Sequence, residues 1–303
     1  MAVAEHISKV LPAARAPAPV PYALSGASIR LTEAQKAAFR RDGFLVVHDL
    51  TTPEEIASLR VAYDRLFSER RGWENGDLFD MVGRDSAESP LSLPQFLWPS
   101  RYEPSLLHTQ LRASAYAIAQ QLVGPQPQNI LEHAIMKPAF HGSATPWHQD
   151  DAFSRKGSGF LEAISIWMPL QDVDPGSGCM QYIPGSNLGP LYRHRSPGND
   201  PRIHGLEIVP GPDLSKRVEV PLPQGSAVIH HSRTLHSAGI NTSEQPRRAY
   251  ILGYAVQARR HSLFSRDYAW NLEKRTAREQ RSMQNLPALK RGLRRIRRLF
   301  RGG

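Results

Sequence analysis

The sequence has one cysteine, Cys179, among 303 residues, and none of its apolar runs approaches the ~18 residues that a membrane-spanning helix needs. A single cysteine excludes an intrachain disulfide and argues against a zinc site built on thiolates. No internal repeat is evident, which argues against a repeat architecture. We therefore expect a cytoplasmic protein in a reducing environment, with Cys179 as a small core residue.

Acidic residues are scarce, relative to basic ones, only in the C-terminal stretch 259–303. The formal net charge is +10, but residues 259–303 contain 14 Lys and Arg against 3 Asp and Glu, so the remainder sums to about −1. A near-neutral body makes a nucleic-acid partner an unfavoured interpretation. We expect three parts: a disordered Ala- and Pro-rich arm over 1–26 without the apolar region of a secretory signal, a domain over 27–258, and a basic helical tail over 259–303.

The tail has apolar residues at three- and four-residue spacing with arginines between them. The residues with this spacing are Leu289, Leu293, Ile296 and Phe300. The pattern is typical of a basic amphipathic helix that contacts an acidic partner or a membrane surface. A solvated tail without a partner has the same pattern, so both interpretations stay open. The sequence indicates no oligomeric state.

The first third of the chain predicts helices. A capping box at Thr32 begins a helix that Gly43 ends, and Thr52 caps a second helix. Apolar residues at helical spacing predict a third helix over about 104–124. The stretch 72–103 has weak periodicity, and we expect it to be a loop that could wall a pocket.

After residue 124 the pattern changes to short β runs broken by Pro and Gly. Strands are expected near 129–137, 160–170, 178–183, 218–220, 226–230, 234–238 and 248–257, with another at 44–47. Such strands, following a helical half, indicate a sandwich or barrel with helices packed outside. The Pro-, Gly- and Arg-rich stretch 184–217 is either an active-site lid or a floppy insert.

The stretch from Thr145 to Asp150, which reads TPWHQD, is a candidate for half of a metal site. In an extended strand, side chains two residues apart leave the same face. His148 and Asp150 would therefore point to one place, and Gln149 would point away from it. A lone His-x-Asp is weak evidence for a metal site, so the interpretation depends on whether the sequence offers further ligands.

A third ligand is available from a later histidine cluster. His230, His231 and His236 lie close together, and alternation along one straight strand would put His230 and His236 on the same face. Spacing alone does not choose between them. Two histidines and one carboxylate on one face of a metal leave about three octahedral positions open, the arrangement of non-haem Fe(II) oxygenases.

Several motifs accompany this pattern. An arginine follows His236 after eleven residues, at Arg247. The other matching segments are Leu31-Thr32, Asp42-Gly43-Phe44-Leu45-Val46-Val47, Lys137-Pro138, Trp167-Met168-Pro169-Leu170 and Gly178-Cys179-Met180-Gln181-Tyr182-Ile183-Pro184-Gly185-Ser186. In order and spacing, over about residues 31–256, the chain resembles the phytanoyl-CoA dioxygenase family of Fe(II)/2-oxoglutarate oxygenases.

The resemblance implies an α+β fold with a mainly β core: a double-stranded β-helix, or cupin-like jelly roll, with N-terminal helices packed outside. It implies that the iron ligands are His148, Asp150 and His236. It also implies that Arg247 binds the distal carboxylate of 2-oxoglutarate, as a guanidinium does through a bidentate fork. Arg248 is the rival to Arg247, because only one of two neighbours on a strand can face the site.

Position-matching from His148 further places His133, Lys137 and Trp167 near the cosubstrate. The chain departs from the family where the distal histidine is commonly followed by Gly-Ser. Here Ser237 and Ala238 follow it, so the family's serine hydroxyl is absent at the second position.

The implied activity is hydroxylation of an aliphatic C–H bond of a small molecule, with Fe(II), 2-oxoglutarate and O2 as cofactors and succinate and CO2 as co-products. Ascorbate is expected to stimulate it. Relatives that halogenate have Ala or Gly where this chain has Asp150, so we expect hydroxylation. The long motif around the ectoine-hydroxylase His-x-Asp is not found, which argues against ectoine as substrate.

Other classes of function stay open. The chain could be a catalytically silent cupin-like binding protein, or an oxygenase directed to nucleic acid or a membrane by its tail. We expect a secondary metabolite or a lipid-like acid as substrate. Four basic residues lie in segments that could line the substrate pocket: Arg155, Lys156, Arg193 and Arg195. They would suit an anionic substrate, although a solvated loop carries the same charges.

Overall fold

The computed structural model describes residues 29–83, 85–86, 90–140, 142–154, 160–209, 211–257 and 267–285. The expected arm over 1–26, the expected amphipathic helix near 289–300, and Arg155 and Lys156 lie outside these residues. In the described part of the chain, no helix combines the length and the apolar character needed to cross a bilayer.

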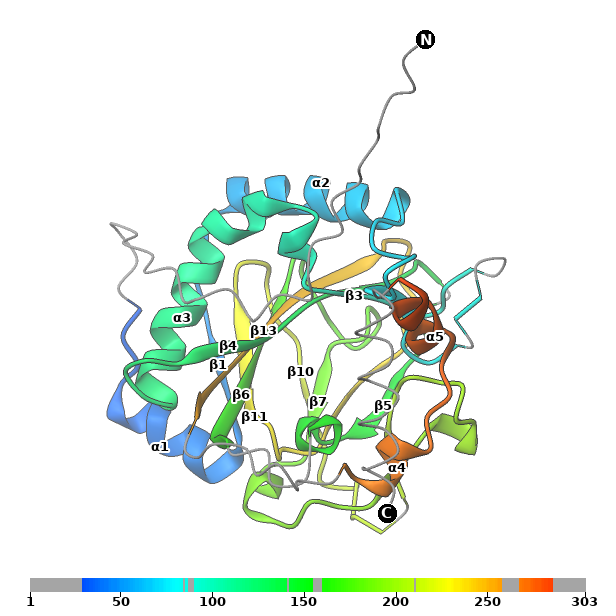
Figure 1. The fold of residues 1–303 in the computed structure, drawn as a ribbon. Coiled ribbons are helices and arrows are strands. Elements are labelled where there is room, and N and C mark those ends of the chain that lie inside the picture. The colour runs from blue at the N-terminus through cyan, green and yellow to red at the C-terminus, as the bar shows by residue number, and fades with distance from the viewer. Residues whose placement is uncertain are drawn as a thin grey trace.

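Two antiparallel sheets form the body (Figure 1). The larger has the order β1-β11-β6-β13-β4-β3-β2, with the bounds Phe44–Val47 (β1), Leu78–Asp80 (β2), Pro94–Leu97 (β3), Gln128–Lys137 (β4), Phe160–Pro169 (β6), Ala227–His231 (β11) and Arg247–Gln257 (β13). The smaller has the order β10-β7-β12-β5, with the bounds Thr145–His148 (β5), Met180–Tyr182 (β7), Val218–Val220 (β10) and His236–Ala238 (β12). A separate hairpin pairs β8 (His194–Arg195) with β9 (Glu207–Ile208).

The large sheet is buried on both faces because its side chains alternate between two cores. Ile166 and Met168 of β6 pack in the core that includes helix residues, whereas Trp167 packs with residues of the smaller sheet. In β13, Tyr250 and Ile251 divide in the same way. One core therefore lies under the helices and the other lies between the sheets, which is the expected double-stranded β-helix.

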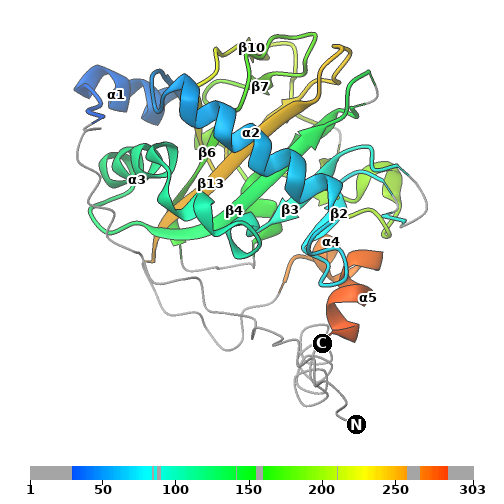
Figure 2. The ribbon, with the colours of Figure 1, turned by 90° about the horizontal axis from the view of Figure 1, so that it is seen from above.

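Five α-helices surround the sheets in the described residues: Glu33–Asp42 (α1), Pro53–Ser68 (α2), Gln110–Leu122 (α3), Ala269–Leu272 (α4) and Ala277–Gln284 (α5). Figure 2 shows α2 and α3 lying across one face of the large sheet. The capping box at Thr32 is present, and Gly43 ends α1 with φ 82°. A Cβ added at Gly43 would lie 2.5 Å from Thr234 Oγ1, so glycine is required there by both conformation and space.

Two expectations for the first half of the chain are wrong in detail. The predicted third helix is divided: a 3-10 helix covers Pro104–His108, and Thr109 is extended and caps α3 with its side chain. The predicted loop 72–103 contains β2 and β3, which extend the large sheet beyond β4. Strands of three and four residues are too short to show an alternating pattern.

The stretch 184–217, in its described residues, packs against the body. It contains the β8–β9 hairpin, and Gly205 donates from its backbone N–H to the Met81 carbonyl at 2.7 Å. Arg193 and Arg195 do not line the main cavity described below, and Arg195 pairs with Glu207 at 2.7 Å. They are therefore not the cations that a substrate in this cavity would meet.

The described part of the expected tail, 267–285, contains α4 and α5 and packs against the body. Arg281 donates to the Trp73 carbonyl at 2.8 Å and to Asp85 Oδ2 at 2.8 Å, and its guanidinium lies 3.7 Å from the centre of the Trp73 ring. Arg278 lies over Phe79 at 4.9 Å. These arginines hold the segment on residues 73–85 by stacking as well as by charge.

A buried polar network ties the helical layer to the large sheet. Glu132 on β4 accepts from Tyr250 Oη and from Ser100 Oγ, each at 2.6 Å, and lies 3.3 Å from Arg112 Nη1. Arg112 also donates to Tyr250 Oη at 2.8 Å. The carboxylate is fully buried, so its charge depends on these partners.

Replacing Glu132→Gln should lower the free energy of unfolding by about 3–5 kcal/mol, because Arg112 would lose its buried counter-charge. Urea denaturation followed by circular dichroism measures the change. Glu162→Gln, at an exposed residue near the start of β6, is the matched control, with an expected change within about 0.5 kcal/mol. Equal effects of the two substitutions would contradict the role of the network.

Candidate metal centre and cosubstrate pocket

The pairing of β5 with β12 brings two histidines together from distant parts of the chain. His148 lies directly opposite His236 in the ladder, and their ring centroids are 4.2 Å apart. Gln149 stays extended before Asp150 opens a 3-10 helix, Asp150–Phe153 (η3). Asp150 thus returns to the face of His148, and one potential ligand atom from each of the three side chains lies within 4.8 Å of the others.

The hydrogen bonds of the two imidazoles determine which nitrogen each offers. His148 Nδ1 lies 2.8 Å from the Pro146 carbonyl, and His236 Nδ1 lies 2.8 Å from the Thr234 carbonyl. A carbonyl oxygen only accepts, so both Nδ1 atoms donate and both Nε2 atoms keep a lone pair. The Nε2 atoms lie 3.6 and 3.5 Å from Asp150 Oδ1. This donor set fits a divalent metal.

Burial lowers the pKa of His148 and of His236, so both rings are neutral at neutral pH, as metal ligation requires. Burial alone would raise the pKa of Asp150. The neighbouring imidazoles and the hydrogen bond from His230 instead hold that pKa well below its usual range. The cluster is therefore prepared as two neutral donors and one anion.

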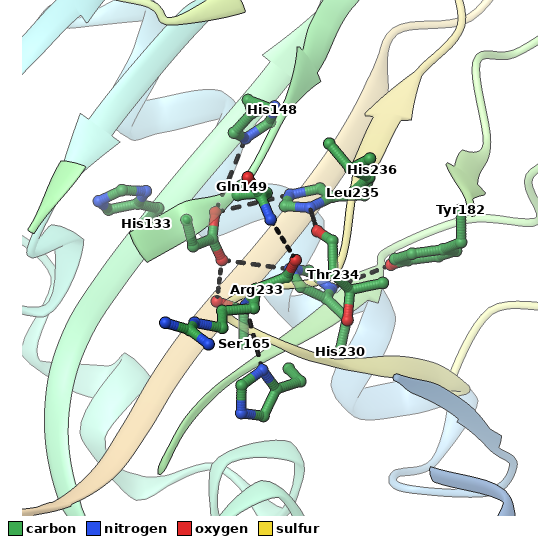
Figure 3. A network of polar contacts seen from close by, with 12 residues as sticks. His133, His148, Gln149, Ser165, Tyr182, His230, Arg233, Thr234, Leu235 and His236 are labelled. Atoms are coloured by element: carbon green, nitrogen blue, oxygen red, sulfur yellow. Dashed lines mark hydrogen bonds and ion pairs between the residues drawn. The ribbon is translucent and has the colours of Figure 1, made fainter. Parts of the chain in front are cut away.

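His230 belongs to the site in a different way from His236. Its Nε2 lies 3.2 Å from Asp150 Oδ2 and its Nδ1 lies 3.0 Å from Tyr182 Oη. An ionised carboxylate only accepts, so Nε2 donates and Nδ1 accepts from the tyrosine. His230 therefore has no lone pair directed at the metal position and orients Asp150 instead. Figure 3 shows His230 with its partner Tyr182. His231 accepts from the Arg233 backbone N–H at 3.1 Å.

Ser165 on β6 was not found from the sequence. Its hydroxyl donates to Asp150 Oδ2 at 2.6 Å, so this oxygen is held by both Ser165 and His230. Asp150 Oδ1, the oxygen nearer His148 and His236, is left for a metal. The carboxylate is thereby arranged to bind through one oxygen.

Gln149 points away from the cluster, as strand alternation predicts. Its amide donates to the Arg233 carbonyl at 2.7 Å and to the Pro190 carbonyl at 3.1 Å, and it accepts from the Tyr192 N–H at 2.9 Å. Its backbone N–H donates to His194 Nε2 at 3.1 Å. These bonds fix the backbone between the two candidate ligands.

Arg247 and Arg248 face opposite ways. Arg248 pairs with Asp64 at 2.7 Å, toward α2. Arg247 is buried and lies 5.2 Å from the centre of the Trp167 ring, and its Nε and Nη1 have no hydrogen-bond partner among the described residues. Burial lowers the pKa of Arg247 to about 9. A buried guanidinium with two unbonded nitrogens is suited to an anionic ligand, which would supply acceptors and a counter-charge.

The cluster and Arg247 line one cavity of about 590 Å³, which also has Trp167 and His133 in its wall. Burial lowers the pKa of His133 to about 3, and its Nδ1 is bonded to the Gln95 amide at 2.5 Å. The volume lies within the range of about 300–1,000 Å³ typical of small-molecule sites.

The expected position of Lys137 near the cosubstrate differs in the structure. Lys137 does not line the cavity; its ammonium donates to the carbonyls of Ala238, at 3.2 Å, and Gly239. Ala238, at the position where the family commonly has serine, lines the cavity, and the Ser237 hydroxyl turns to Gln181 at 3.3 Å.

Replacing Ser165→Ala should weaken Fe(II) or Co(II) binding about 10- to 100-fold, because Asp150 Oδ2 loses its shortest hydrogen bond. Metal titration of the apo-protein measures the change. Ser237→Ala, on the strand of His236 but bonded away from the cluster, is the control and should leave the affinity unchanged. A Ser165 variant with unaltered affinity would refute this role.

Acid should destabilise the metal-free protein. Burial lowers the pKa of the histidines at 133, 148, 194, 204 and 236 below the value of about 6.5 that they have when unfolded. As pH falls from 6.5 toward 4, the unfolded chain binds protons that the folded chain does not. Each such histidine then removes up to about 1.4 kcal/mol of stability per pH unit. Urea midpoints at pH 7 and pH 5 test this, and equal midpoints would contradict it.

Comparisons with known proteins agree with this geometry. The family model described as Phytanoyl-CoA dioxygenase (PhyH) matches residues 39–249. The crystal structure of EvdO2 from Micromonospora carbonacea var. aurantiaca, also solved with 2-oxoglutarate, is 32% identical with a TM-score of 0.63, covering 79% of this chain and 94% of that one.

The curated relatives either have a lower sequence identity to this chain or match a shorter part of it. L-proline trans-4-hydroxylase of Streptomyces griseoviridis is 33% identical over 45% of this chain, which spans only 58% of that enzyme. Peroxisomal phytanoyl-CoA dioxygenase of Rattus norvegicus is 25% identical over 73% of this chain and 67% of its own. With a family match over most of the described domain, the chain belongs to the phytanoyl-CoA dioxygenase family of Fe(II)/2-oxoglutarate oxygenases.

Proposed function

We propose that this protein hydroxylates an aliphatic C–H bond of a small molecule, using Fe(II), 2-oxoglutarate and O2. The observation that carries the proposal is the buried guanidinium of Arg247, whose Nε and Nη1 have no partner in the part of the chain that the structure describes. It lines the same cavity as the cluster of His148, Asp150 and His236. A three-ligand cluster alone fits many metal proteins. A cluster with an unpaired cation beside it fits a metal that shares its site with a diacid.

In this proposal, iron would be held by His148 and His236 through Nε2 and by Asp150 through Oδ1. Iron with 2-oxoglutarate and O2 supplies the oxidising chemistry, which yields succinate and CO2. Arg247 binds the distal carboxylate of the cosubstrate, and the Trp167 ring packs beside that guanidinium. Lys137 supports the turn after β12 through the carbonyls of Ala238 and Gly239.

The remaining lining of the cavity suits an organic substrate more than water. Leu97, Leu131, Ile135 and Ile251 contribute apolar surface to it. Neutral His133 adds a polar group without charge. Such a lining keeps the reacting C–H bond in a partly dry space. Ascorbate is proposed to stimulate turnover.

Replacing Arg247→Met should weaken 2-oxoglutarate binding about 100-fold, the loss expected for a charge-assisted pair of hydrogen bonds. Anaerobic charge-transfer absorbance of the Fe(II) protein, titrated with 2-oxoglutarate, measures affinity, and succinate formation measures turnover. His148→Ala should abolish both signals.

The control is Arg248→Met, which removes the neighbouring guanidinium that pairs with Asp64 outside the cavity. It should leave cosubstrate affinity within about twofold of wild type, a change of less than 0.5 kcal/mol. Equal losses in the two arginine variants would count against the proposed role of Arg247. Absence of iron binding in the wild type would overturn the function.

A further inference from the structure

The wall of the main cavity contains a buried amide that the metal and the cosubstrate do not need. Gln95 lies on β3, is 1% exposed and lines the cavity. Its neighbour Phe96 packs in the core under the helices, so Gln95 turns to the opposite face of the sheet. Its Oε1 is buried without a hydrogen-bond partner among the described residues. Because an unbonded buried acceptor is costly, this atom points to a ligand that donates a hydrogen bond.

The nitrogen of the same amide determines the tautomer of His133. Gln95 Nε2 lies 2.5 Å from His133 Nδ1. An amide nitrogen only donates, so Nδ1 accepts and the proton of the neutral ring is on Nε2. His133 also lines the cavity, and its ring makes no second hydrogen bond to the described part of the chain. The pair therefore offers one free acceptor, Gln95 Oε1, and one free donor, His133 Nε2–H.

Turning the amide over exchanges these roles and leads to the same result. Gln95 Oε1 would then accept from Nδ1–H of His133, the amide nitrogen would be the free donor, and His133 Nε2 would be the free acceptor. A hydroxyl matches either arrangement, because one oxygen both donates and accepts. A carboxylate has no proton to donate, and an ammonium has no lone pair with which to accept.

The surroundings of the pair are neutral. Burial lowers the pKa of His133 to about 3, although the charge of Asp150 raises it. Burial is also the main reason that the pKa of His204, another lining residue, lies well below its usual range. The centre of the His204 ring lies 4.5 Å from that of Phe79. Uncharged imidazoles among aromatic rings suit a neutral ligand group.

The charged residues of the lining leave no separate charge for a substrate to match. Lys274 lines the cavity together with the carboxylates of Asp267 and Glu279. Burial lowers the pKa of Lys274 to about 7, and the charge of Glu279 raises it. Arg247 and Asp150 have the roles proposed above. The group that the pair binds is therefore recognised by hydrogen bonds and not by charge.

The pair lies apart from the arginine that would bind the cosubstrate. His133 is opposite Ile251 in the β4–β13 ladder, and Arg247 lies four residues before Ile251. At about 3.3 Å per residue, these strand positions are ~13 Å apart. His133 is nevertheless close enough to the metal cluster for Asp150 to act on its pKa, and Figure 3 shows it with His148. A group bound by the pair would be separate from the distal carboxylate of the cosubstrate and near the metal.

We propose that Gln95 and His133 form a substrate subsite that binds a hydroxyl group on a molecule with an apolar body. The hydroxyl donates to one of the two side chains and accepts from the other, and Leu97 and Phe153 contribute apolar lining. Gln95 is then a specificity-determining residue. This inference rests on the proposed function, because it places a C–H bond close to that hydroxyl at the metal cluster.

Isothermal titration of the full-length protein, anaerobic and saturated with Fe(II) and 2-oxoglutarate, tests the proposal. The probes are hexan-1-ol, its isomer 1-methoxypentane, hexanoate and hexylammonium. The ether has the same atoms as the alcohol but no proton to donate. Wild type should bind hexan-1-ol about tenfold or more tightly than each other probe, because these leave a buried donor or acceptor unbonded.

Gln95→Met keeps the length of the side chain and removes both polar amide atoms. It should reduce the preference for the alcohol over the ether about tenfold, to near one, while the affinities for 1-methoxypentane and 2-oxoglutarate stay within about twofold. His133→Phe, on the neighbouring strand β4, should lose the same preference. Gln120→Met, at an exposed glutamine, is the matched control and should behave as wild type.

A wild type that binds the alcohol and the ether equally would overturn the proposal, as would a folded variant of either residue that keeps the preference. An equal loss of 2-oxoglutarate affinity in Gln95→Met would also overturn it, because the pair would then serve the cosubstrate. Either variant is a sufficient test if the other does not fold. The result is separable from the proposed function. If the wild type does not bind iron or 2-oxoglutarate, the oxygenase function fails, and titration of the metal-free protein still shows whether the preference for the alcohol depends on Gln95.

Discussion

The ladder contact between β5 and β12 is the constraint on which the candidate site depends. It sets His148 opposite His236, and one backbone carbonyl fixes each imidazole with Nε2 toward Asp150. Because these carbonyls are two residues before each histidine, every ring is oriented by its own strand. The site is thus a product of strand register: a slip of one residue would turn one ring out of the cavity.

The sequence alone predicted those features whose signals are local. The capping box at Thr32 and the left-handed Gly43 follow from neighbouring residue types. His148 and Asp150 share a face because Gln149 is extended between them, and alternation also predicts that Arg247 and Arg248 separate. What alternation could not decide was the choice between His230 and His236. That choice depends on tautomers set by Tyr182 and Thr234, which no spacing reveals.

Features that depend on tertiary contact were missed for physical reasons. Ser165 carries no signal in its own strand, and its role exists only because β6 passes Asp150. The basic end of the chain was interpreted from its charge count, which does not distinguish a solvated arginine from one stacked on a ring. Arg281 lies on Trp73, and Lys274 is buried on the 204–205 backbone. Their contact partners lie at least sixty residues earlier in the chain.

The cavity takes its lining from two separate parts of the chain. The candidate metal ligands and Arg247 lie before residue 257, whereas Asp267, Asn271, Lys274 and Glu279 lie in the segment 267–285. Substitutions in that segment would change its part of the cavity lining and leave the candidate ligands as they are. The two parts could therefore diverge independently in evolution.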